Sequence, residues 1–402
     1  MATAPQKPNA PAAPAKGAPA PAAAAPAKPG GLAAVTNKIK SFFLLSREVI
    51  GVDIGSHSIK VAYFKTEGGV ITLKTWGVLP LDLNPEASPE QKKQQAVNLL
   101  RAFLIQKGVQ VKEASTSISG NAVIVRYVKF PKLNKDELWA TLATEAEPFI
   151  PFDIKDVQLG FHILGDLMEE GQKKMETVLV AAKRDAVQAR VEVLEAAGLK
   201  PTIIDVDSFA LENIFERLRG PRDDGAATLY LNIGHTVTNL SIIESGVTRV
   251  VRDVFISGIS FTKAIMKALQ LDIAKAEEAK KKHGLIIDAE EKEKALQEGN
   301  REALGVSQAV AGVVRDLVAE VHRSVDFYLS QGPERSIGRI QLAGGSARMR
   351  NLAKHLTGEL KVPVDVMNPL SFLKTPVDVP VEMQPALGVV VGLALRSNKD
   401  WV

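Results

Sequence analysis

Two segments of the chain, residues 49–64 and 228–243, share one pattern of apolar and polar positions. In each segment apolar residues alternate along the chain, a short polar stretch that begins with a glycine interrupts them, and the alternation then resumes. This pattern predicts two strands joined by a glycine turn. Asp53-Ile54-Gly55 in the first segment aligns with Asn232-Ile233-Gly234 in the second, 179 residues further on. The internal repeat predicts two related domains, each of which opens with a β-hairpin.

The rest of the chain alternates between helical and strand periodicities, which predicts an α/β fold. The predicted helices span residues 89–106, 135–149, 184–197, 261–270, 273–283, 308–329 and 386–395. The predicted strands span residues 115–130, 157–164, 177–181, 337–343 and 362–367. Residues 113–198 follow the order strand, helix, strand, strand, helix, and we interpret them as a subdomain inserted into the first half.

The first 48 residues differ in composition from the rest. Residues 1–30 contain 13 Ala, 8 Pro and 3 Lys, with no acidic and no aromatic residue. Because such a segment has little to bury and lacks the apolar core of a signal peptide, we predict a disordered tail. Residues 31–48 form a short amphipathic lead-in. Its narrow apolar face favours packing on the first domain over binding to a membrane or a partner.

Composition and charge exclude several classes of protein. At about 100–200 residues per domain, 402 residues correspond to two to four packed units. The absence of cysteine rules out disulfides, thiolate metal sites and a cysteine nucleophile. The longest apolar stretch, residues 386–395, is about half of the ~20 residues that a transmembrane helix needs. Three of the basic residues lie in the tail, so 47 basic residues face 46 acidic ones elsewhere, and we expect no nucleic-acid surface.

The glycine turns are candidate phosphate-binding loops. Backbone N–H groups in such turns can point at a phosphate, and turns from two sister domains can grip it from both sides. In the first turn, Asp53 is placed to hold a Mg²⁺-bound water and Lys60 to reach a phosphate oxygen. A third motif, LAGGSARM at residues 342–349, has Gly344-Gly345 after an apolar strand, where a nucleoside can lie against the backbone. Each motif alone is compatible with an ordinary turn, but together they favour nucleotide binding.

In this order the motifs resemble those of the actin-like ATPase superfamily. In detail they resemble the PilM family of type IV pilus assembly proteins, which is related to the cell-division protein FtsA. The resemblance covers about residues 47–397. It is carried by VIGVDIGSHSIKVAYF (49–64), VRYVKFPKLNKDEL (125–138), EAEPFIPF (145–152), LEAAGLKPTIIDVDSFAL (194–211), AEEAKKKHG (276–284) and GLALR (392–396).

The resemblance implies an actin-like fold, a duplicated ribonuclease H-like α/β architecture with two halves around a nucleotide cleft. The first half would comprise residues 49–112 and 199–225, and the second residues 226–262 and 311–402. An inserted subdomain of the FtsA/PilM type would span residues 113–198. A small helical subdomain would span residues 263–310.

The resemblance also implies ATP or ADP with Mg²⁺ in the cleft. Glu277 and Lys280 would lie on the helix near the ribose, unless they are solvated surface charges. Asp207 would lie near the attacking water, or equally would cap a helix. The remaining implied site residues are Asp53, Gly55, Ser56 and Lys60 in the first phosphate loop, Asn232, Gly234 and Thr236 in the second, and Gly344, Gly345 and Arg348 in the adenosine turn. His57 and His235 also lie in the turns. We expect turn side chains to point outward, with phosphate contact as the alternative.

One position departs from the pattern of the superfamily. The second phosphate loop of actin-like ATPases usually opens with Asp, and here the residue is Asn232. An amide keeps the shape of the side chain but can neither attract Mg²⁺ by charge nor act as a base toward water. Our hypothesis is that nucleotide binding persists while Asp53, Asp207 and Asn232 support at most slow hydrolysis.

The resemblance implies a cytoplasmic scaffold at the cytoplasmic face of the inner membrane. It would bind the cytoplasmic N-terminus of a PilN-like inner-membrane protein, contact other pilus inner-membrane and motor components, and couple nucleotide state to pilus assembly. Membrane association would run mainly through these partners. A small-molecule kinase of the same superfamily is one alternative, but it would need a catalytic Asp beside a polar pocket. An FtsA-like division protein is another, but its C-terminal anchor would need more room than we expect in the six residues after Arg396.

Overall fold

The computed structural model describes residues 48–81, 87–218, 225–374 and 376–396, and all of these belong to one compact unit. The predicted tail and nearly all of the lead-in lie outside the described residues. Within the described ranges, no helix has both the length and the apolar composition required to cross a membrane.

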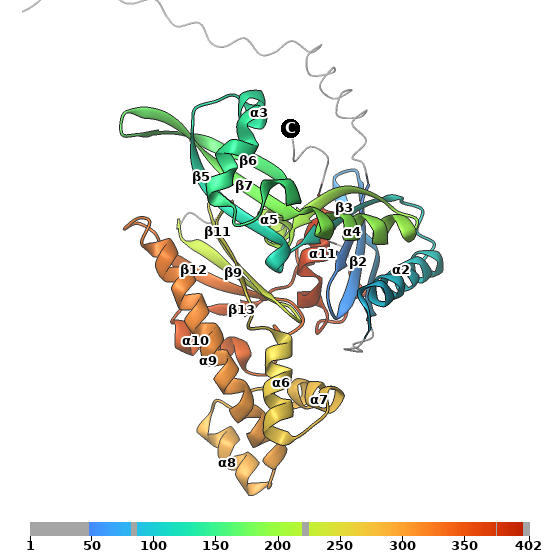
Figure 1. Cartoon of the computed structure of the whole chain (residues 1–402). Helices are drawn as coiled ribbons and strands as arrows, with labels where there is room; N and C mark the ends of the chain where they lie inside the picture. Colours follow the sequence, from blue (N-terminus) through green and yellow to red (C-terminus); the bar gives the residue numbers. More distant parts are fainter. Residues whose placement is uncertain (1–47, 82–86, 219–224, 375, 397–402) are drawn as a thin grey trace, which may run out of the picture. The chain divides into compact units, whose positions relative to one another are not determined.

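Five strands form the first sheet, in the order β3-β2-β1-β4-β8 (Figure 1). They are β1 (Ile50–Ile54), β2 (Ser58–Glu67), β3 (Val70–Pro80), β4 (Glu113–Ile118) and β8 (Lys200–Val206). The first three pair antiparallel, whereas β1, β4 and β8 pair parallel. Helices α2 (Pro89–Gln106) and α4 (Arg184–Ala196) share the core of this sheet. The predicted bounds of α2 are confirmed, because Ser88 and Gln91 form a capping box at its start.

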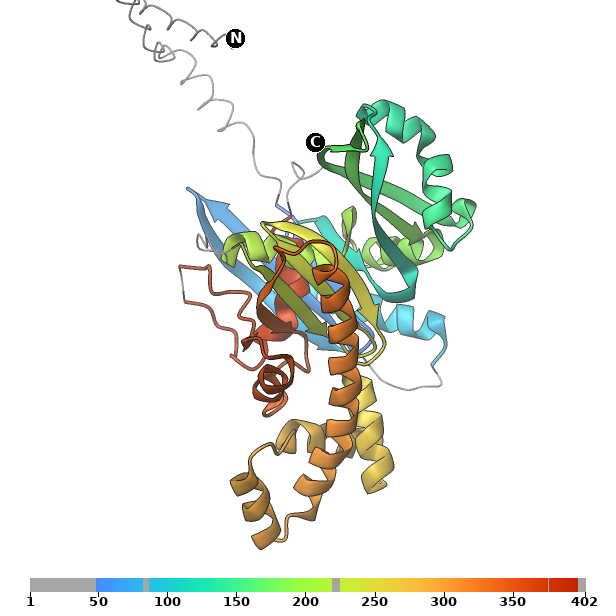
Figure 2. The same ribbon diagram turned by 90° about the vertical axis from the view of Figure 1, so that its left-hand side faces the viewer.

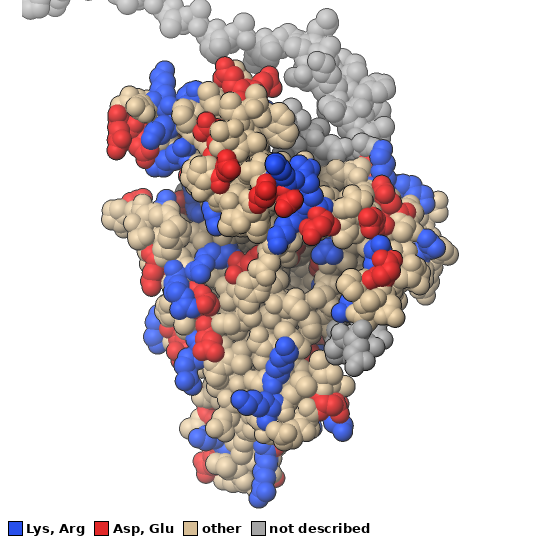
Figure 3. All heavy atoms as spheres, in the orientation of Figure 1, with Lys and Arg blue, Asp and Glu red and all other residues tan. Residues whose placement is uncertain are grey.

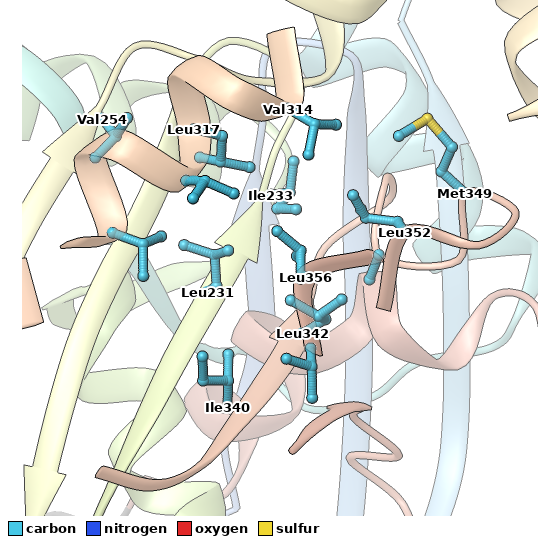
Figure 4. Close-up of a cluster of buried hydrophobic side chains, with 14 of the residues drawn as sticks. Leu231, Ile233, Val254, Val314, Leu317, Ile340, Leu342, Met349, Leu352 and Leu356 are labelled. Atoms are coloured by element: carbon cyan, nitrogen blue, oxygen red, sulfur yellow. The ribbon is translucent and has the colours of Figure 1, made fainter. Parts of the chain in front are cut away.

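The second sheet repeats this arrangement, in the order β11-β10-β9-β12-β13. Its strands are β9 (Ala227–Ile233), β10 (Thr238–Glu244), β11 (Val247–Val254), β12 (Ile337–Ala343) and β13 (Val364–Val366). Three antiparallel strands are again followed by two parallel ones. The sequence repeat therefore corresponds to a repeated topology. Figure 4 shows part of the core of this half, where Leu231 of β9 lies near Leu317 of α9 (Arg301–Leu329) and Leu342 of β12 belongs to the same cluster.

Three further strands form a small sheet with its own core, in the order β5-β7-β6. These are β5 (Val123–Pro131), β6 (Val157–Glu169) and β7 (Gln172–Lys183), and α3 (Lys135–Ala146) packs on them. The single strand predicted at residues 115–130 is wrong, because a turn at Gly120, with φ of +68°, divides it between β4 and β5. Strand β4 belongs to the first sheet, and α4 packs in the core of that sheet. We therefore propose that the insert spans about residues 119–183 and not 113–198.

Four helices follow the second hairpin. They are α6 (Gly258–Leu269), α7 (Ile273–His283), α8 (Ala289–Gln297) and α9. Helix α9 runs from beside the second sheet to the small helices α7 and α8 (Figure 2). It begins at Arg301 and not at the predicted residue 308, because the Asn300 side chain accepts a hydrogen bond from the Ala303 N–H and caps the helix there.

The last helix that the structure describes packs against the first half. After α10 (Leu352–Leu360), the apolar stretch predicted as a helix forms a 3-10 turn (Gln384–Leu387) and α11 (Gly388–Ala394), every residue of which is buried. A Cβ on Gly392 would lie 1.8 Å from the carbonyl oxygen of Ala210, in α5 (Asp207–Leu218). A Cβ on Gly51 of β1 would lie 2.5 Å from the Val390 carbonyl oxygen. The glycines therefore allow α11 to pack directly on the backbones of both neighbours.

Candidate functional site

A cavity of about 630 Å³ opens where the glycine turns of both sheets meet. This volume lies in the range of about 300–1,000 Å³ that is typical of small-molecule sites. Its lining includes every predicted site residue except Arg348. These are Asp53, Gly55, Ser56, Lys60, Asp207, Asn232, Gly234, Thr236, Glu277, Lys280, Gly344 and Gly345. The fold thus brings together residues that lie far apart in the sequence.

The first turn is positioned by the pairing of β1 with β2, in which Asp53 lies opposite Lys60. The Lys60 Nζ is 3.1 Å from the Asp53 Oδ2, and both side chains are mostly buried. The Gly55 N–H donates to the Ser58 carbonyl at 3.2 Å. A Cβ on Gly55 would lie only 3.0 Å from the Lys60 Nζ and from the Ser58 oxygen. Glycine therefore allows the lysine ammonium and the turn backbone to converge at the cavity wall.

In the second turn, Asn239 takes the place of Lys60, because it lies opposite Asn232 in the pairing of β9 with β10. The Asn232 Nδ2 donates to the Asn239 Oδ1 at 2.9 Å, and the Asn239 Nδ2 donates to the Asp253 Oδ1 at 2.7 Å. The Asp253 Oδ2 also accepts the Gly120 N–H at 2.6 Å. A chain of hydrogen bonds therefore joins the second turn to the loop that leads into the inserted sheet.

The two turns also contact each other. The Ser56 Oγ and the Thr236 Oγ1 are 3.0 Å apart. The rings of His57 and His235 do not point outward as expected but stack, with centroids 4.9 Å apart. Burial lowers the pKa of both imidazoles, that of His235 to about 4, so both are neutral at pH 7. The His57 Nδ1 is buried without a hydrogen-bond partner among the described residues, so this atom of the cavity wall suits a polar ligand group.

Asp207 is the first residue of α5 and part of the cavity wall, and its place near an attacking water stays a prediction. Burial and the neighbouring Asp53 raise the pKa of Asp207 to about 7, although hydrogen bonds from Ser117 and Ser119 act in the opposite direction. Arg190 of α4 lines the same wall, and its Nε donates to the Ser117 carbonyl at 3.2 Å. No motif marks Arg190, and the sequence analysis missed it.

On the opposite wall, Lys280 and Glu277 of α7 are not solvated surface charges. Lys280 is only 5% exposed, and its Nζ lies 2.6 Å from the Glu277 Oε2 and 3.0 Å from the Thr262 Oγ1. Burial opposes ionisation of Glu277, but Lys280 and Thr262 outweigh it and lower the pKa of that carboxyl. Burial also lowers the pKa of Lys280. The pair is therefore held rigidly beside the cavity. Its contact with a ribose stays a prediction.

The third glycine motif follows β12. Gly344 has a φ of +88°, and a Cβ there would lie 2.4 Å from the Ile233 carbonyl oxygen, so only glycine fits without strain. A Cβ on Gly345, by contrast, would meet no atom within 4 Å. The Arg348 Nη1 donates to the Val381 carbonyl at 3.0 Å, outside the residues that line the cavity. The open side of Gly345 suits a flat ligand group, whereas Arg348 is directed elsewhere.

These features fit a nucleoside phosphate. The turns supply backbone N–H groups and a lysine, and the wall near Gly345 leaves room for a ring system. The described residues contain no group of three His, Cys, Asp or Glu side chains that could hold a metal ion by themselves. A Mg²⁺ ion in nucleotide sites is usually held by one or two carboxylates together with the phosphates, and Asp53 would be the first of them.

A second cavity, of about 650 Å³, lies between the inserted sheet, the first half and the start of β11, and we call it the insert groove. Strand β6, one edge of the inserted sheet, contributes residues 158–162. The Tyr127 hydroxyl in its lining is buried without a hydrogen-bond partner among the described residues. The lining is otherwise mainly apolar and includes Ile118, Leu159, Phe161, Leu164, Val178, Val180, Val187, Ile204, Val206 and Phe209.

The chain is similar to known proteins along most of its length. A sequence model of the family described as type IV pilus assembly protein PilM matches residues 51–398. Among solved structures, the "PilM-PilN type IV pilus biogenesis complex" matches at 28% identity with a TM-score of 0.73, over 87% of this chain and 98% of that chain. The ethanolamine utilization protein EutJ from Carboxydothermus hydrogenoformans matches at 14% identity and a TM-score of 0.49, over 86% and 89%. MreB5 of Spiroplasma citri bound to ADP matches at 13% identity and a TM-score of 0.44, over 86% and 94%.

Proposed function

The chain belongs to the PilM family of type IV pilus assembly proteins and has an actin-like fold, and from this premise we propose that it is a nucleotide-binding scaffold of the pilus machine. The observation that carries the proposal is the meeting of three separate glycine motifs and Lys60 around one cavity. In the proposal the protein acts at the cytoplasmic face of the inner membrane, which it reaches through partner proteins. The space-filling view supports contacts with proteins over nucleic acid, since basic and acidic side chains are interspersed on the face shown (Figure 3).

ATP or ADP would bind with its phosphates between the two turns and its adenosine against Gly345. Lys60 and the N–H groups of the turns would bind phosphate oxygens, and Asp53 would hold Mg²⁺ through water. Bound ATP would supply a transferable phosphoryl group. The uncharged amide of Asn232 stands where a carboxylate could act as a base, so we propose slow turnover at most. This role suits a protein in which bound nucleotide acts mainly as a structural signal.

The insert groove would bind the cytoplasmic N-terminus of a PilN-like protein as an extended segment. The solved relative is a complex of PilM with PilN. In this chain, β6 is an edge strand of the inserted sheet, and its residues 158–162 line the mainly apolar groove together with residues of β5 and β7. Exposed edges bind extended peptides through main-chain hydrogen bonds, and neighbouring pockets bind alternate side chains. The Tyr127 hydroxyl would then donate to a polar group of the peptide.

Peptide binding can be tested with two matched glycine variants in β6. A Cβ on Gly160 or on Gly165 meets no atom within 4 Å, so valine fits the fold at both positions. Only Gly160 lines the groove. In a fluorescence polarisation assay with a labelled N-terminal peptide of the PilN-like protein, Gly160→Val should weaken binding about 10-fold or more, while Gly165→Val should bind as the wild type does. Equal affinities for both variants would place the peptide elsewhere.

Nucleotide binding needs a separate measurement, which calorimetry with Mg²⁺ and ADP provides. Lys60→Ala should weaken binding about 10-fold or more, because the variant removes a charge-assisted contact with phosphate. Lys354→Ala removes a lysine that pairs with Asp288 at 2.9 Å on the surface, away from the cavity lining, and should leave nucleotide affinity unchanged. Failure of the wild-type protein to bind either ADP or ATP would refute the nucleotide-binding part of the proposal.

A further inference from the structure

The nucleotide cavity and the insert groove share a wall. In β4, Ser117 lines the cavity and Ile118 lines the groove. Where β8 meets α5, Val206 lines the groove and Asp207 lines the cavity. Successive side chains of a strand point to opposite faces. A single stretch of backbone therefore separates the two cavities at each of these points.

Helix α4 forms the third part of this wall. Val187 lines the groove, and Arg190, almost one turn further along, lines the cavity. The helix follows directly from β7, and its first residue, Arg184, binds β6 and the turn before it. The Arg184 Nη1 donates to the Gln158 Oε1 of β6 at 3.0 Å, and the Nε donates to the Lys155 carbonyl of the preceding 3-10 turn at 3.0 Å. Gln158 is itself part of the groove lining. One end of α4 is thus attached to the groove, and a point about 9 Å along its axis reaches the cavity.

The guanidinium of Arg190 is suited to respond to phosphate. Among the described residues, the guanidinium donates its hydrogen bond to the Ser117 carbonyl, and it does so through Nε. The carboxyl groups of Asp207 and Asp53 attract its positive charge. Arginine presents five N–H donors in a planar fork that matches phosphate oxygens. Its Nη groups can therefore gain acceptors when phosphate groups enter the cavity, while the Nε keeps its bond to β4.

We propose that Arg190 is a nucleotide-sensing residue, which passes phosphate occupancy of the cavity to the insert groove through α4. This inference rests on the proposed function, in which the cavity binds nucleotide and the groove binds the partner peptide. A movement of Arg190 toward phosphate shifts α4, and with it Val187 and the contacts of Arg184 to β6. Because coupling between two sites is reciprocal, peptide in the groove changes nucleotide affinity by the same factor.

The test measures peptide affinity in three states of the full chain: without nucleotide, with saturating Mg²⁺ and ADP, and with saturating Mg²⁺ and AMPPNP. The probe is the labelled N-terminal peptide of the PilN-like protein. We expect the wild-type dissociation constant to differ about 5-fold or more between the nucleotide-free state and at least one nucleotide state, the lower end of typical allosteric coupling. Arg190→Gln should reduce that ratio to within about twofold of unity.

Two further variants separate coupling from charge and from folding. Lys354 pairs with Asp288 at 2.9 Å on the surface, outside the linings of both cavities, so Lys354→Gln removes one positive charge without touching α4 and should retain the wild-type ratio. If loss of the charge unfolds the Arg190→Gln variant, Arg190→Lys can be measured in its place, because lysine keeps a positive charge in the wall. Thermal unfolding of each variant shows that it is folded.

The outcomes distinguish this inference from the function on which it rests. The inference is supported if Arg190→Gln alone, or both Arg190 variants, lose the dependence of peptide affinity on nucleotide while Lys354→Gln retains it. If the wild-type protein binds both ligands but its ratio is near unity, the inference is overturned and the proposed function stands. The same holds if both Arg190 variants keep the ratio of the wild-type protein. Failure of either ligand to bind the wild type overturns the proposed function, and the sensing role falls with it.

Discussion

Two adjacent glycines in the third motif give a prediction that separates folding from binding. Gly344 and Gly345 both line the cavity between the glycine turns, but alanine should have opposite consequences at the two positions. At Gly344 the added Cβ would lie 2.4 Å from the Ile233 carbonyl oxygen, on a backbone with a φ of +88°. At Gly345 it would meet no atom within 4 Å. Gly344→Ala should therefore destabilise the protein, whereas Gly345→Ala should fold normally and obstruct the nucleoside.

The expected magnitudes follow from these contacts. A left-handed conformation costs an L-residue about 1–2 kcal/mol, and relief of the contact at Gly344 costs about 1–3 kcal/mol more. The sum of about 2–5 kcal/mol corresponds to a fall in Tm of roughly 3–7 °C for a unit of about 350 residues. For Gly345→Ala the free energy of unfolding should change by less than about 0.5 kcal/mol. An added methyl group against a bound nucleoside should weaken affinity about 5- to 150-fold.

Thermal unfolding without nucleotide, followed by circular dichroism, measures the first effect. Titration of a fluorescent ADP analogue in the presence of Mg²⁺ measures the second. Wild-type affinity in a normally folded Gly345→Ala protein would show that the nucleoside does not lie against this residue. A Tm of Gly344→Ala within about 2 °C of the wild type would show that the strain argument is wrong.

Three further predictions concern packing, pH and turnover. Gly392→Ala places a Cβ 1.8 Å from a backbone oxygen of α5 and should lower the free energy of unfolding by about 3 kcal/mol or more. Gly312 lies in α9, where an added Cβ meets no atom within 4 Å, so Gly312→Ala should raise the free energy of unfolding by up to about 1 kcal/mol. Chemical denaturation compares the two variants. Because the pKa of Asp207 is raised from 3.8 to about 7, its ionisation opposes folding fully above pH 7 and not at all below about pH 3.8. Asp207→Asn should therefore raise Tm at pH 8 and leave it unchanged at pH 3.5, and an equal effect at both pH values would contradict this reasoning. Asn232→Asp should increase phosphate release from ATP roughly 10-fold or more, and equal rates would show that the amide does not limit turnover.

The elements that the sequence predicted well are those fixed by local patterns. The two hairpins need only period-two alternation and a glycine turn, and both features lie within about 15 residues in each repeat. The error at residues 115–130 has a non-local cause: β4 pairs with β1 and β8, whereas β5 pairs with β7. No change of periodicity marks the point where one strand leaves the first sheet and the next enters another. The glycine at position 120, with its positive φ, is the signal that could have divided them.

The same distinction applies to the site. The glycine motifs could be predicted because a turn that approaches a ligand closely requires glycine whatever surrounds it. Arg190 could not, since it reaches the cavity only because α4 crosses beside β4. The insert groove depends on the order β5-β7-β6, which leaves β6 at an edge, and strand order is not written in any single segment. Arg348, close to the glycine pair in sequence, is directed to the Val381 carbonyl. Proximity in sequence was therefore a poor guide to side-chain direction.

The structure also gives a physical reason for the amide at position 232. Asn239 accepts a hydrogen bond from Asn232 with its carbonyl oxygen and donates one to Asp253 with its amide nitrogen. Asp253 is an acceptor-only carboxylate, and it receives the Gly120 N–H as well. A carboxylate at position 232 would put a second acceptor-only group at the other end of Asn239, whose single carbonyl would then face a negative charge at about 2.9 Å. The departure from the superfamily pattern therefore preserves a link from the second turn to the insert. This favours a chain in which the cavity serves communication more than hydrolysis.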